Sequence, residues 1–470
     1  MTTIGSLFWV VAVAAGFAFP TGGCAKTGAI RGVSDGGGAR QPDTGLGSRA
    51  WSMAEPVQNE AANDDGSPSV AMNAAGDGMI AFQRGGALWA RPYEGVNQRW
   101  GAPVRVAPIS RARDFQVGMD GQGNALIVWA RDDTDADQGI WSSRTTDRGA
   151  TWSAPRRISA GPHTRPTLAV GPNEGALAAW TAHLSDNTNT VMTCDFRDGD
   201  WNTTLNMPLM GTDSGDRNPR VAVDGMGRGF VIWGQPAVPN EVSSVWTERY
   251  DGGWQAPSVE PLESYDDDDA DTPSVALNET GAGMAIWQQI TAAGPEIWAR
   301  RFDGARWQNP VMVGMGFLVE WDPPPQVAID PAGDAVAIWS QVLPNNHFVY
   351  DVFAARFVAG TAAWEAPQAL ETDNMIGSDL TQYAKPLVGM DRAGNALASW
   401  RKVTASNRVL VHASQRALTA TTWTPVNGTA LYDDGVGSAL STDFAVSRDG
   451  TAIAAWTAGP AFDAWVSVYR

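Results

Sequence analysis

Apolar and polar positions form blocks that recur along the chain after residue 67. Each block has Pro and an apolar pair, then Asp or Asn with a tight turn and Gly, then an Ala-rich apolar run that ends in Trp. The clearest copies run from Pro273 to Trp287 and from Gln326 to Trp339. The other copies end at Phe82, Trp129, Trp180, Trp233, Trp400 and Trp456. A repeat of roughly 50 residues is typical of propellers and solenoids built from small units.

Each repeat contains four short apolar stretches that we expect to be β-strands. In the fifth repeat they cover residues 274–278, 284–288, 297–302 and 307–313. Turn residues that tolerate positive φ, such as Asp303-Gly304, separate them. The second stretch of each repeat is apolar throughout, which is typical of a strand covered on both faces. The pattern predicts an all-β propeller of four-stranded antiparallel blades.

The two ends of the repeat region are complementary. The eighth repeat stops after its third strand, at residues 465–470, and an unpaired fourth-strand segment, residues 51–57, precedes the first repeat. We expect this N-terminal strand to complete the last blade, because pairing the two ends removes an open sheet edge. The sequence therefore predicts an eight-bladed β-propeller over residues 49–470.

Tryptophan recurs at fixed places in the repeat. The chain has 22 Trp residues, which fall largely at the end of the second strand, within the third strand and at the start of the fourth. Such a row is typical either of sugar-stacking surfaces, as in lectins, or of packing between blades. We expect packing, because the same positions recur in nearly every repeat.

Residues 1–23 have the pattern of an export signal. The apolar run from Leu7 to Phe19 is shorter than the roughly 20 residues that span a bilayer. The segment Thr21-Gly22-Gly23-Cys24 resembles the lipobox of bacterial lipoproteins, which implies that Cys24 carries a lipid after cleavage. Residues 24–48 are rich in Gly and predict a flexible tether. We expect a lipid-anchored protein of the bacterial cell envelope, with secretion as the alternative, and a buried thiol at Cys194.

A turn motif in the second repeat resembles a known family of propellers. The segment Thr145-Thr-Asp147-Arg-Gly149-Ala-Thr151-Trp152 is similar to the Asp-box of sialidase-like propellers, with Thr145 in place of Ser. Its Asp is expected to satisfy turn amides and its Gly to allow the chain reversal. The resemblance supports the propeller fold.

The resemblance to sialidases implies a specific catalytic apparatus. It consists of three Arg on a substrate carboxylate, a Tyr nucleophile assisted by Glu, an Asp acid/base and an Arg-Ile-Pro-like segment. That segment is absent from this sequence. Arg113, Arg165 and Arg217 do fall near the start of the first strand in three consecutive repeats, and they are the candidate anion-binding residues. Surface solvation or ion pairing with acidic residues is the alternative for these three arginines.

Acidic residues gather in the long, variable loops. Asp133, Asp135 and Asp137 stand at alternate positions between Asp132 and Gly139, as in calcium-binding loops. A solvated charge run is the alternative reading. These three residues are our candidate calcium ligands, and no other cofactor is expected. The net charge of −18 makes nucleic acid and anionic membrane surfaces unsuitable partners.

Long loops on a rigid scaffold are the usual place for binding. We therefore expect a monomeric, non-catalytic propeller that binds a protein or carbohydrate partner through its long-loop face. The alternative is a sialidase-like glycoside hydrolase, which requires Arg113, Arg165 and Arg217 to converge in one pocket.

Overall fold

The computed structural model describes most of the repeat region. The described residues are 49–58, 67–108, 113–131, 136–184, 188–202, 215, 217–236, 242–256, 260–263, 269–315, 324–343, 346–370, 386–404, 408–425, 430–433, 439–459 and 463–470. The predicted signal segment, tether and Cys24 lie outside these residues. None of the described segments forms a helix that is long and apolar enough to cross a membrane.

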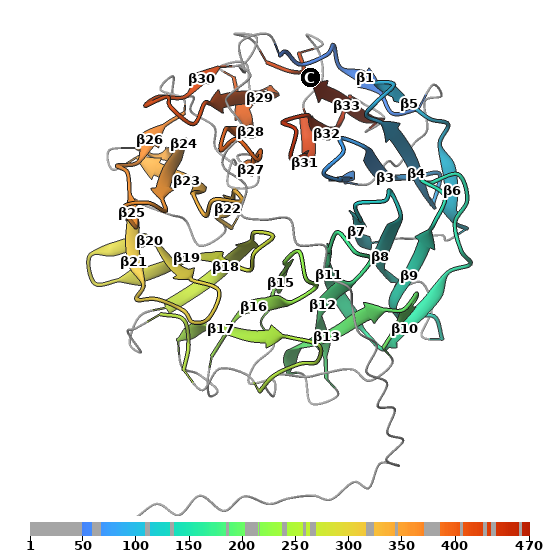
Figure 1. The fold of residues 1–470 in the computed structure, drawn as a ribbon, viewed down its shortest axis with the longest axis horizontal. Coiled ribbons are helices and arrows are strands. Elements are labelled where there is room, and N and C mark those ends of the chain that lie inside the picture. Colours follow the sequence, from blue (N-terminus) through green and yellow to red (C-terminus); the bar gives the residue numbers. More distant parts are fainter. Residues whose placement is uncertain are drawn as a thin grey trace, which may run out of the picture. The chain divides into compact units, whose positions relative to one another are not determined.

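Eight antiparallel sheets are arranged as the blades of a ring (Figure 1). Blade 1 consists of β2 (Ser69–Met72), β3 (Gly78–Arg84), β4 (Ala87–Glu94), β5 (Arg99–Trp100) and β6 (Val104–Ala107), and blade 2 of β7 (Arg113–Met119), β8 (Ala125–Arg131), β9 (Gly139–Thr145) and β10 (Arg156–Ala160). Blade 3 consists of β11 (His163–Val170), β12 (Ala176–His183), β13 (Asn189–Arg197) and β14 (Asp200–Trp201), and blade 4 of β15 (Arg220–Val223), β16 (Gly229–Pro236) and β17 (Ser243–Tyr250).

The second half of the ring has the same plan. Blade 5 consists of β18 (Asp269–Leu277), β19 (Gly283–Thr291), β20 (Gly294–Phe302) and β21 (Val311–Met315), and blade 6 of β22 (Gln326–Ile329), β23 (Ala335–Leu343), β24 (Asn346–Val358), β25 (Ala363–Trp364) and β26 (Gln368–Ala369). Blade 7 consists of β27 (Leu387–Met390), β28 (Ala396–Val403), β29 (Val409–Arg416) and β30 (Thr424–Pro425), and blade 8 of β31 (Ala439–Val446), β32 (Ala452–Ala458), β33 (Asp463–Tyr469) and β1 (Glu55–Pro56). The predicted eight-bladed β-propeller is confirmed.

The N-terminal segment closes the ring as predicted. In β1, Glu55 pairs with Val466 and Pro56 with Trp465. The pairing continues outside the strand, because the Ala50 N–H donates to the Arg470 carbonyl at 3.0 Å and the Ser52 N–H to the Val468 carbonyl at 2.8 Å. First strands of successive blades contact one another around the whole ring, including β31 of blade 8 and β2 of blade 1.

Each pair of blades encloses its own small core. The second strands are buried along almost their whole length, as β8 and β32 show. Their terminal Trp side chains fill the interfaces, and Trp129, Trp180, Trp233, Trp287 and Trp456 are all 0% exposed. These repeated rings pack between blades, so this row does not form a sugar-stacking surface.

Arginine side chains cover the aromatic rings of the next blade. Arg144 lies over Phe196 at 5.4 Å, and Arg249 lies over Phe302 at 5.6 Å. Phe302 in turn contacts Trp307 at the start of the fourth-strand segment, with ring centroids 5.3 Å apart. Cation–π contacts of this kind add to the stability of each interface.

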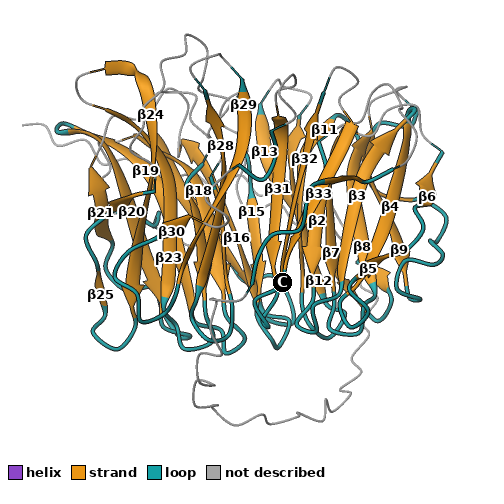
Figure 2. Ribbon diagram, turned by 90° about the horizontal axis from the view of Figure 1, so that it is seen from above, coloured by secondary structure: helices purple, strands orange, loops and turns teal. Residues whose placement is uncertain are grey.

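The two faces of the ring differ. The turns after the first and third strands are short and lie on one face, which we call the short-turn face; it is the lower face in Figure 2. The second strands end, and the first strands begin, on the other face, which we call the long-loop face.

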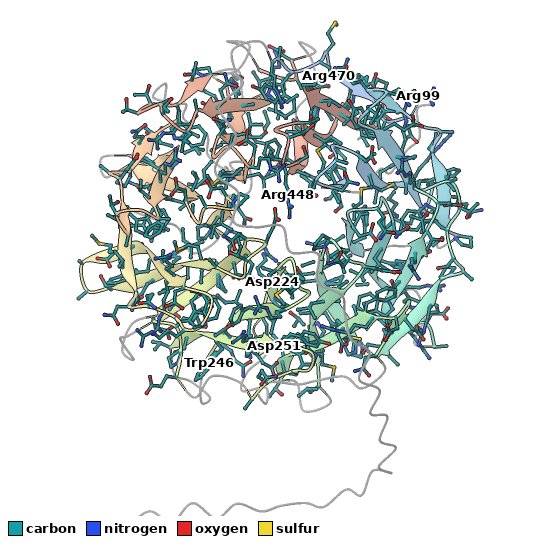
Figure 3. The ribbon with its side chains drawn as sticks, viewed as in Figure 1. Arg99, Asp224, Trp246, Asp251, Arg448 and Arg470 are labelled. Carbon is teal, nitrogen blue, oxygen red and sulfur yellow. The ribbon has the colours of Figure 1, made fainter. Side chains whose placement is uncertain are left out.

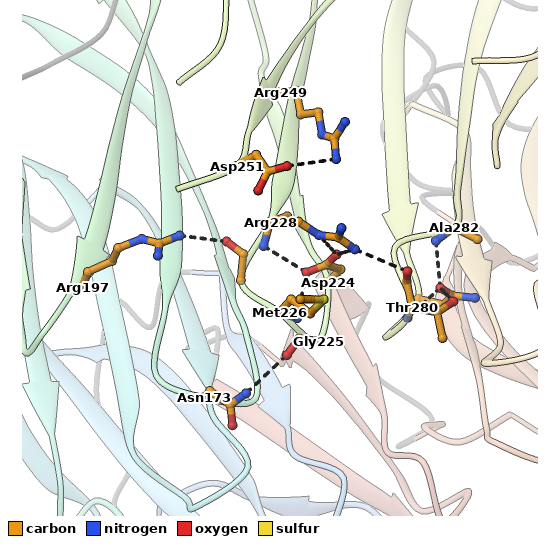
Figure 4. A network of polar contacts seen from close by, with 12 residues as sticks. Asn173, Arg197, Asp224, Gly225, Met226, Arg228, Arg249, Asp251, Thr280 and Ala282 are labelled. Atoms are coloured by element: carbon orange, nitrogen blue, oxygen red, sulfur yellow. Dashed lines mark hydrogen bonds and ion pairs between the residues drawn. The ribbon is translucent and has the colours of Figure 1, made fainter. Parts of the chain in front are cut away.

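Successive short turns are hydrogen-bonded to one another. In blades 3 to 5, the Asn173 amide donates to the Gly225 carbonyl at 3.3 Å, and the Arg228 guanidinium donates to the Thr280 carbonyl at 3.4 Å (Figure 4). Arg448 of blade 8 forms an ion pair with Glu279 of blade 5, and Figure 3 places Arg448 close to the ring axis. Since blades 6 and 7 separate these two residues along the chain, this pair spans the axis.

Candidate functional site

The inner strands begin on the long-loop face with a repeated backbone distortion. Non-glycine residues have positive φ at the same position of five blades: 44° at Asp114, 53° at Arg165, 41° at Asn218, 52° at Thr272 and 30° at Ser441. In four of these blades, the distortion interrupts the register between the first and second strands. Positive φ is uncommon outside glycine, and such positions gather at ligand-binding and active sites.

These distorted residues are neighbours around the ring axis. The Arg165 Nη1 donates to Asn218 Oδ1 of the next blade at 2.7 Å, and the Ser67 and Ser441 hydroxyls of blades 1 and 8 are 2.7 Å apart. Arg165 and Asp114 are exposed. We call the set Ser67, Asp114, Arg165, Asn218, Thr272 and Ser441 the axial ring of polar residues.

The three predicted arginines occupy two different positions of the repeat. Arg113 and Arg217 stand one residue before the distorted position, whereas Arg165 occupies it. Arg165 is exposed, but Arg217 is only 3% exposed, and its Nε donates to the Asn189 carbonyl at 3.0 Å. Arg113 begins β7, and its side chain lies outside the described part of the structure. The three arginines therefore lie in three consecutive blades, and of the two whose side chains are described, Arg165 is exposed and Arg217 is buried.

A further arginine near this position was not predicted. Arg220 is partly buried at the start of β15. Burial lowers its pKa from the usual value, and the positive charge of Arg165 lowers it further. This part of the axial ring therefore contains two arginines whose charges act on one another, although the protein as a whole is acidic.

The repeat contains a signal that could have identified Arg220. In other blades the same position carries a side-chain oxygen that accepts a backbone N–H from the next inner strand. Gln116 accepts from the Leu168 N–H at 2.9 Å and Asp443 accepts from the Val70 N–H at 2.8 Å. A guanidinium cannot accept a hydrogen bond, so Arg220 breaks the pattern of the repeat.

A polar network joins the ends of the strands of blade 3. The His183 Nδ1 is 2.7 Å from Asn189 Oδ1, and its Nε2 is 3.1 Å from the Thr164 hydroxyl. The Asn189 amide donates to the Gly215 carbonyl at 3.2 Å, so its oxygen is left to accept from His183. The resulting order of donors places the His183 proton on Nδ1, and the network holds the ends of β11, β12 and β13 together.

The predicted calcium loop lies largely outside the described residues, which include neither Asp133 nor Asp135. Asp137 is described, and its carboxylate forms an ion pair with Arg131 at 3.2 Å. Within the described ranges, no group of three or more His, Cys, Asp or Glu side chains is arranged to hold a metal ion. Calcium binding therefore stays a prediction.

The Asp-box turn has the internal bonding that the sequence predicts. Asp147 Oδ1 accepts the Thr151 N–H at 2.8 Å, and its Oδ2 accepts the Thr151 hydroxyl at 2.6 Å. These hydrogen bonds lower the pKa of Asp147. The Asp147 carboxylate therefore accepts hydrogen bonds from within its own turn.

Two cavities open on the rim of the ring. One, of about 750 Å³, lies between blades 7 and 8 and is lined by Trp51, Tyr432 and Trp465 among others. The other, of about 390 Å³, lies between blades 2 and 3 beside the Asp-box turn.

No protein-family model matches this chain, and no curated protein matches it. Solved structures of similar fold include the Dos1 propeller (9% identity, 90% of this chain and 95% of that chain, TM-score 0.51). They also include polysaccharide lyase Uly1 (10% identity, 90% and 99%, TM-score 0.45) and the intramolecular trans-sialidase from Ruminococcus gnavus (10% identity, 76% and 94%, TM-score 0.42).

These similarities correct one expectation from the sequence. We expected a ring without catalytic activity, but several of the similar solved propellers are named as enzymes, among them two polysaccharide lyases, a trans-sialidase and an arabinanase. The expectation is wrong as it was argued, because the missing Arg-Ile-Pro-like segment speaks only against a sialidase apparatus, and propeller scaffolds carry catalytic and non-catalytic functions alike. The chain is an eight-bladed β-propeller, and its fold is similar to that of the Dos1 propeller.

Proposed function

We propose that this chain is an exported, lipid-anchored propeller that binds a carboxylated carbohydrate at the axial ring on its long-loop face. The observation that carries the proposal is the exposed Arg165 guanidinium, which donates a hydrogen bond to Asn218 of the next blade at 2.7 Å. The positive charge of Arg165 also acts on Arg220 at the start of β15 and lowers the pKa of Arg220. An anionic ligand is favoured there, because a carboxylate relieves the repulsion between the two guanidinium groups.

The chemistry around Arg165 supports a carbohydrate rather than a simple anion. The axial ring also contains hydroxyl groups from Ser67, Thr272 and Ser441 and the exposed carboxylate of Asp114. Hydroxyls and carboxylates pair with the many hydroxyl groups of a sugar, and the guanidinium pairs with its carboxylate. Positive φ on a hydrogen-bonded strand fixes the direction of each side chain, which lowers the entropic cost of binding.

The proposal is tested by calorimetric titration of the purified protein with oligouronates and with neutral oligosaccharides of equal length. We expect Arg165→Ala to weaken oligouronate binding about tenfold or more, since a charge-assisted hydrogen bond contributes roughly 1.5–3 kcal/mol. Arg306→Ala is the matched control, because Arg306 is 82% exposed on the short-turn face. Equal affinity for neutral and anionic sugars, or equal effects of the two substitutions, contradicts the proposal.

Two further measurements complete the test. Size-exclusion chromatography of a uronate polymer after incubation with the protein shows whether binding leads to cleavage. Export and lipidation are tested by labelling cells with a fatty acid, where Cys24→Ser is expected to abolish incorporation into this chain. Label that persists in the variant excludes Cys24 as the anchor.

A further inference from the structure

One row of side chains connects the inner strands of neighbouring blades. The row, which we call the inner row, stands four residues before the residue that begins each first turn. It consists of Ser69, Gln116, Thr167, Arg220, Ser274, Gln326, Leu387 and Asp443. Three of its members accept a backbone N–H of the next inner strand: Ser69 from Val117 at 3.2 Å, Gln116 from Leu168 at 2.9 Å and Asp443 from Val70 at 2.8 Å.

The corresponding N–H of blade 5 belongs to Val275. Val275 stands three residues before the turn residue Asn278, as Val117 stands three residues before Asp120. The N–H groups of both turn residues donate to the second strand side of their blade, at 2.8 Å for Asn278 and 2.9 Å for Asp120. Because N–H groups alternate in direction along an antiparallel strand, the Val275 N–H points away from β19 and towards the preceding blade, as the Val117 N–H does.

Arg220 occupies the position that should supply the acceptor for this N–H. It belongs to β15, which contacts β18 of blade 5. A guanidinium carries only donors, and the Arg220 Nη1 already donates to the Pro219 carbonyl at 3.3 Å. Within the described segments, neither a side chain nor another blade accepts the Val275 N–H. Two donors therefore meet here without an acceptor.

Arg220 also lacks a counter-ion among the described residues. Its side chain is only partly buried, so a ligand can reach it. Burial lowers its pKa, the positive charge of Arg165 lowers it further, and no described carboxylate raises it. Charged side chains are seldom buried unless they are paired. An anion would supply both the missing acceptor and the missing negative charge.

Blade 7 shows that a missing acceptor alone does not make such a site. Leu387 holds the inner-row position there and cannot accept an N–H from blade 8. Its apolar side chain offers neither a positive charge nor a donor to an anion. Arg220 is the one cationic member of the inner row, so the combination of a guanidinium with an uncovered N–H is specific to blades 4 and 5.

We propose that Arg220 and the Val275 N–H form an anion site that holds one carboxylate group. One carboxylate oxygen pairs with the guanidinium and the other accepts the Val275 N–H. The carboxylate thus replaces the oxygen that Gln116 or Asp443 supplies in other blades. The inference rests on the proposed function only for the source of the carboxylate, which is the acidic sugar bound at the axial ring; a small free acid has the same chemistry.

The test is an NMR titration of deuterated protein with isotope-labelled valine, in which Val275→Ile identifies the Val275 amide signal. The additions are sodium acetate, an oligogalacturonate and methyl galactoside, with sodium chloride at matched ionic strength as the salt control. We expect the Val275 signal to shift saturably with acetate and with the oligogalacturonate, and to stay unchanged with the neutral glycoside and with chloride.

Arg220→Gln is the variant that removes the site. It is expected to fold, because Gln116 and Gln326 hold the same inner-row position, and its amide oxygen can accept the Val275 N–H. We expect it to weaken acetate binding about tenfold or more, the effect of losing a hydrogen bond to a charged group. Arg306→Gln is the matched control, since Arg306 is 82% exposed on the short-turn face, and is expected to respond like the wild type.

The outcomes separate this anion site from the proposed function. If the oligogalacturonate binds the wild type and Arg220→Gln equally and leaves the Val275 signal unchanged, the anion site is overturned and the proposed function stands. If acetate shifts the Val275 signal but no oligogalacturonate binds, the anion site is supported and the proposed function is contradicted. A Val275 signal that responds to neither carboxylate, or equally to chloride, overturns the anion site.

Discussion

Thr145 departs from the pattern of the repeat at the end of the third strand. Thr145 stands where most other blades have an aromatic ring at the end of the third strand, such as Phe196, Tyr250 and Phe302. Its hydroxyl instead bonds to Asp147 at 2.8 Å and to the Gly149 N–H at 2.9 Å. The Asp-box turn thus replaces ring packing with hydrogen bonding at this one blade.

His163 is expected to make stability depend on pH. Its side chain is 8% exposed, and burial lowers its pKa from 6.5 to about 4. The unfolded chain therefore binds a proton between pH 6.5 and 4 that the folded chain does not, and stability falls as the pH falls through this window. For a shift of this size the loss is about 3 kcal/mol.

The measurement is denaturant unfolding of the wild type and His163→Phe at several pH values. The difference in unfolding free energy is expected to change in favour of the variant between pH 6.5 and 4, and to be constant above pH 7.5. Parallel pH profiles for the two proteins would show that His163 does not titrate in this way.

At the scale of the element, the N-terminal strand is the one long-range pairing that joins the chain ends. It covers the edge of β33 through Ser52, Glu55 and Val57, whose N–H donates to the Ala464 carbonyl at 2.8 Å. An uncovered strand edge is a template for pairing with other chains.

Removal of residues 1–58 is therefore expected to destabilise the ring and to cause association. Removal of residues 1–48 is the matched control, because it keeps the closing strand. We expect a lower melting temperature and larger species in size-exclusion chromatography for the shorter chain only. Identical melting and elution of the two truncated chains would show that blade 8 is stable without its fourth strand.

At the scale of the whole molecule, the Arg448–Glu279 ion pair connects blades that are not neighbours. The side chains are 33% and 37% exposed, so solvent and salt screen their attraction. A double-mutant cycle of Arg448→Met and Glu279→Gln in thermal or denaturant unfolding is expected to give a coupling of about 0.2–1 kcal/mol that shrinks at high salt. Additive effects at low salt would mean that the pair does not couple the two blades.

The repeat made much of the architecture predictable. Three local patterns carried the prediction: the positions of Trp129, Trp287 and Trp456, the Asp-Gly turns, and the unpaired segment at residues 51–57. Each pattern fits one place in a closed ring of blades. The fourth strand of blade 5 was less well predicted. It begins at Val311, whereas Trp307 makes only an isolated bridge to Phe302, because outer strands are held on one edge only.

The candidate site was predictable only in part. Arg165 was identified from its place in the repeat, but its exposure and its hydrogen bond to Asn218 of the next blade are features of the tertiary structure. Arg220 was missed because its significance lies in its electrostatic interaction with Arg165, which is 55 residues away in sequence. Asp114, Thr272 and Ser441 were missed because their side chains carry no motif.

The sequence by itself determined the number of blades and the strand order, because hydrophobic periodicity and turn chemistry act between residues that are close in the chain. It also determined the closure of the ring, because the last repeat lacks a fourth strand and the N-terminal segment has the pattern of one. Only the tertiary structure decided which side chains meet across blades: Arg165 with Asn218, Arg448 with Glu279, and the cavity beside Trp152. Those contacts depend on the angle and the register between neighbouring sheets, and the local pattern of residues predicts neither the angle nor the register.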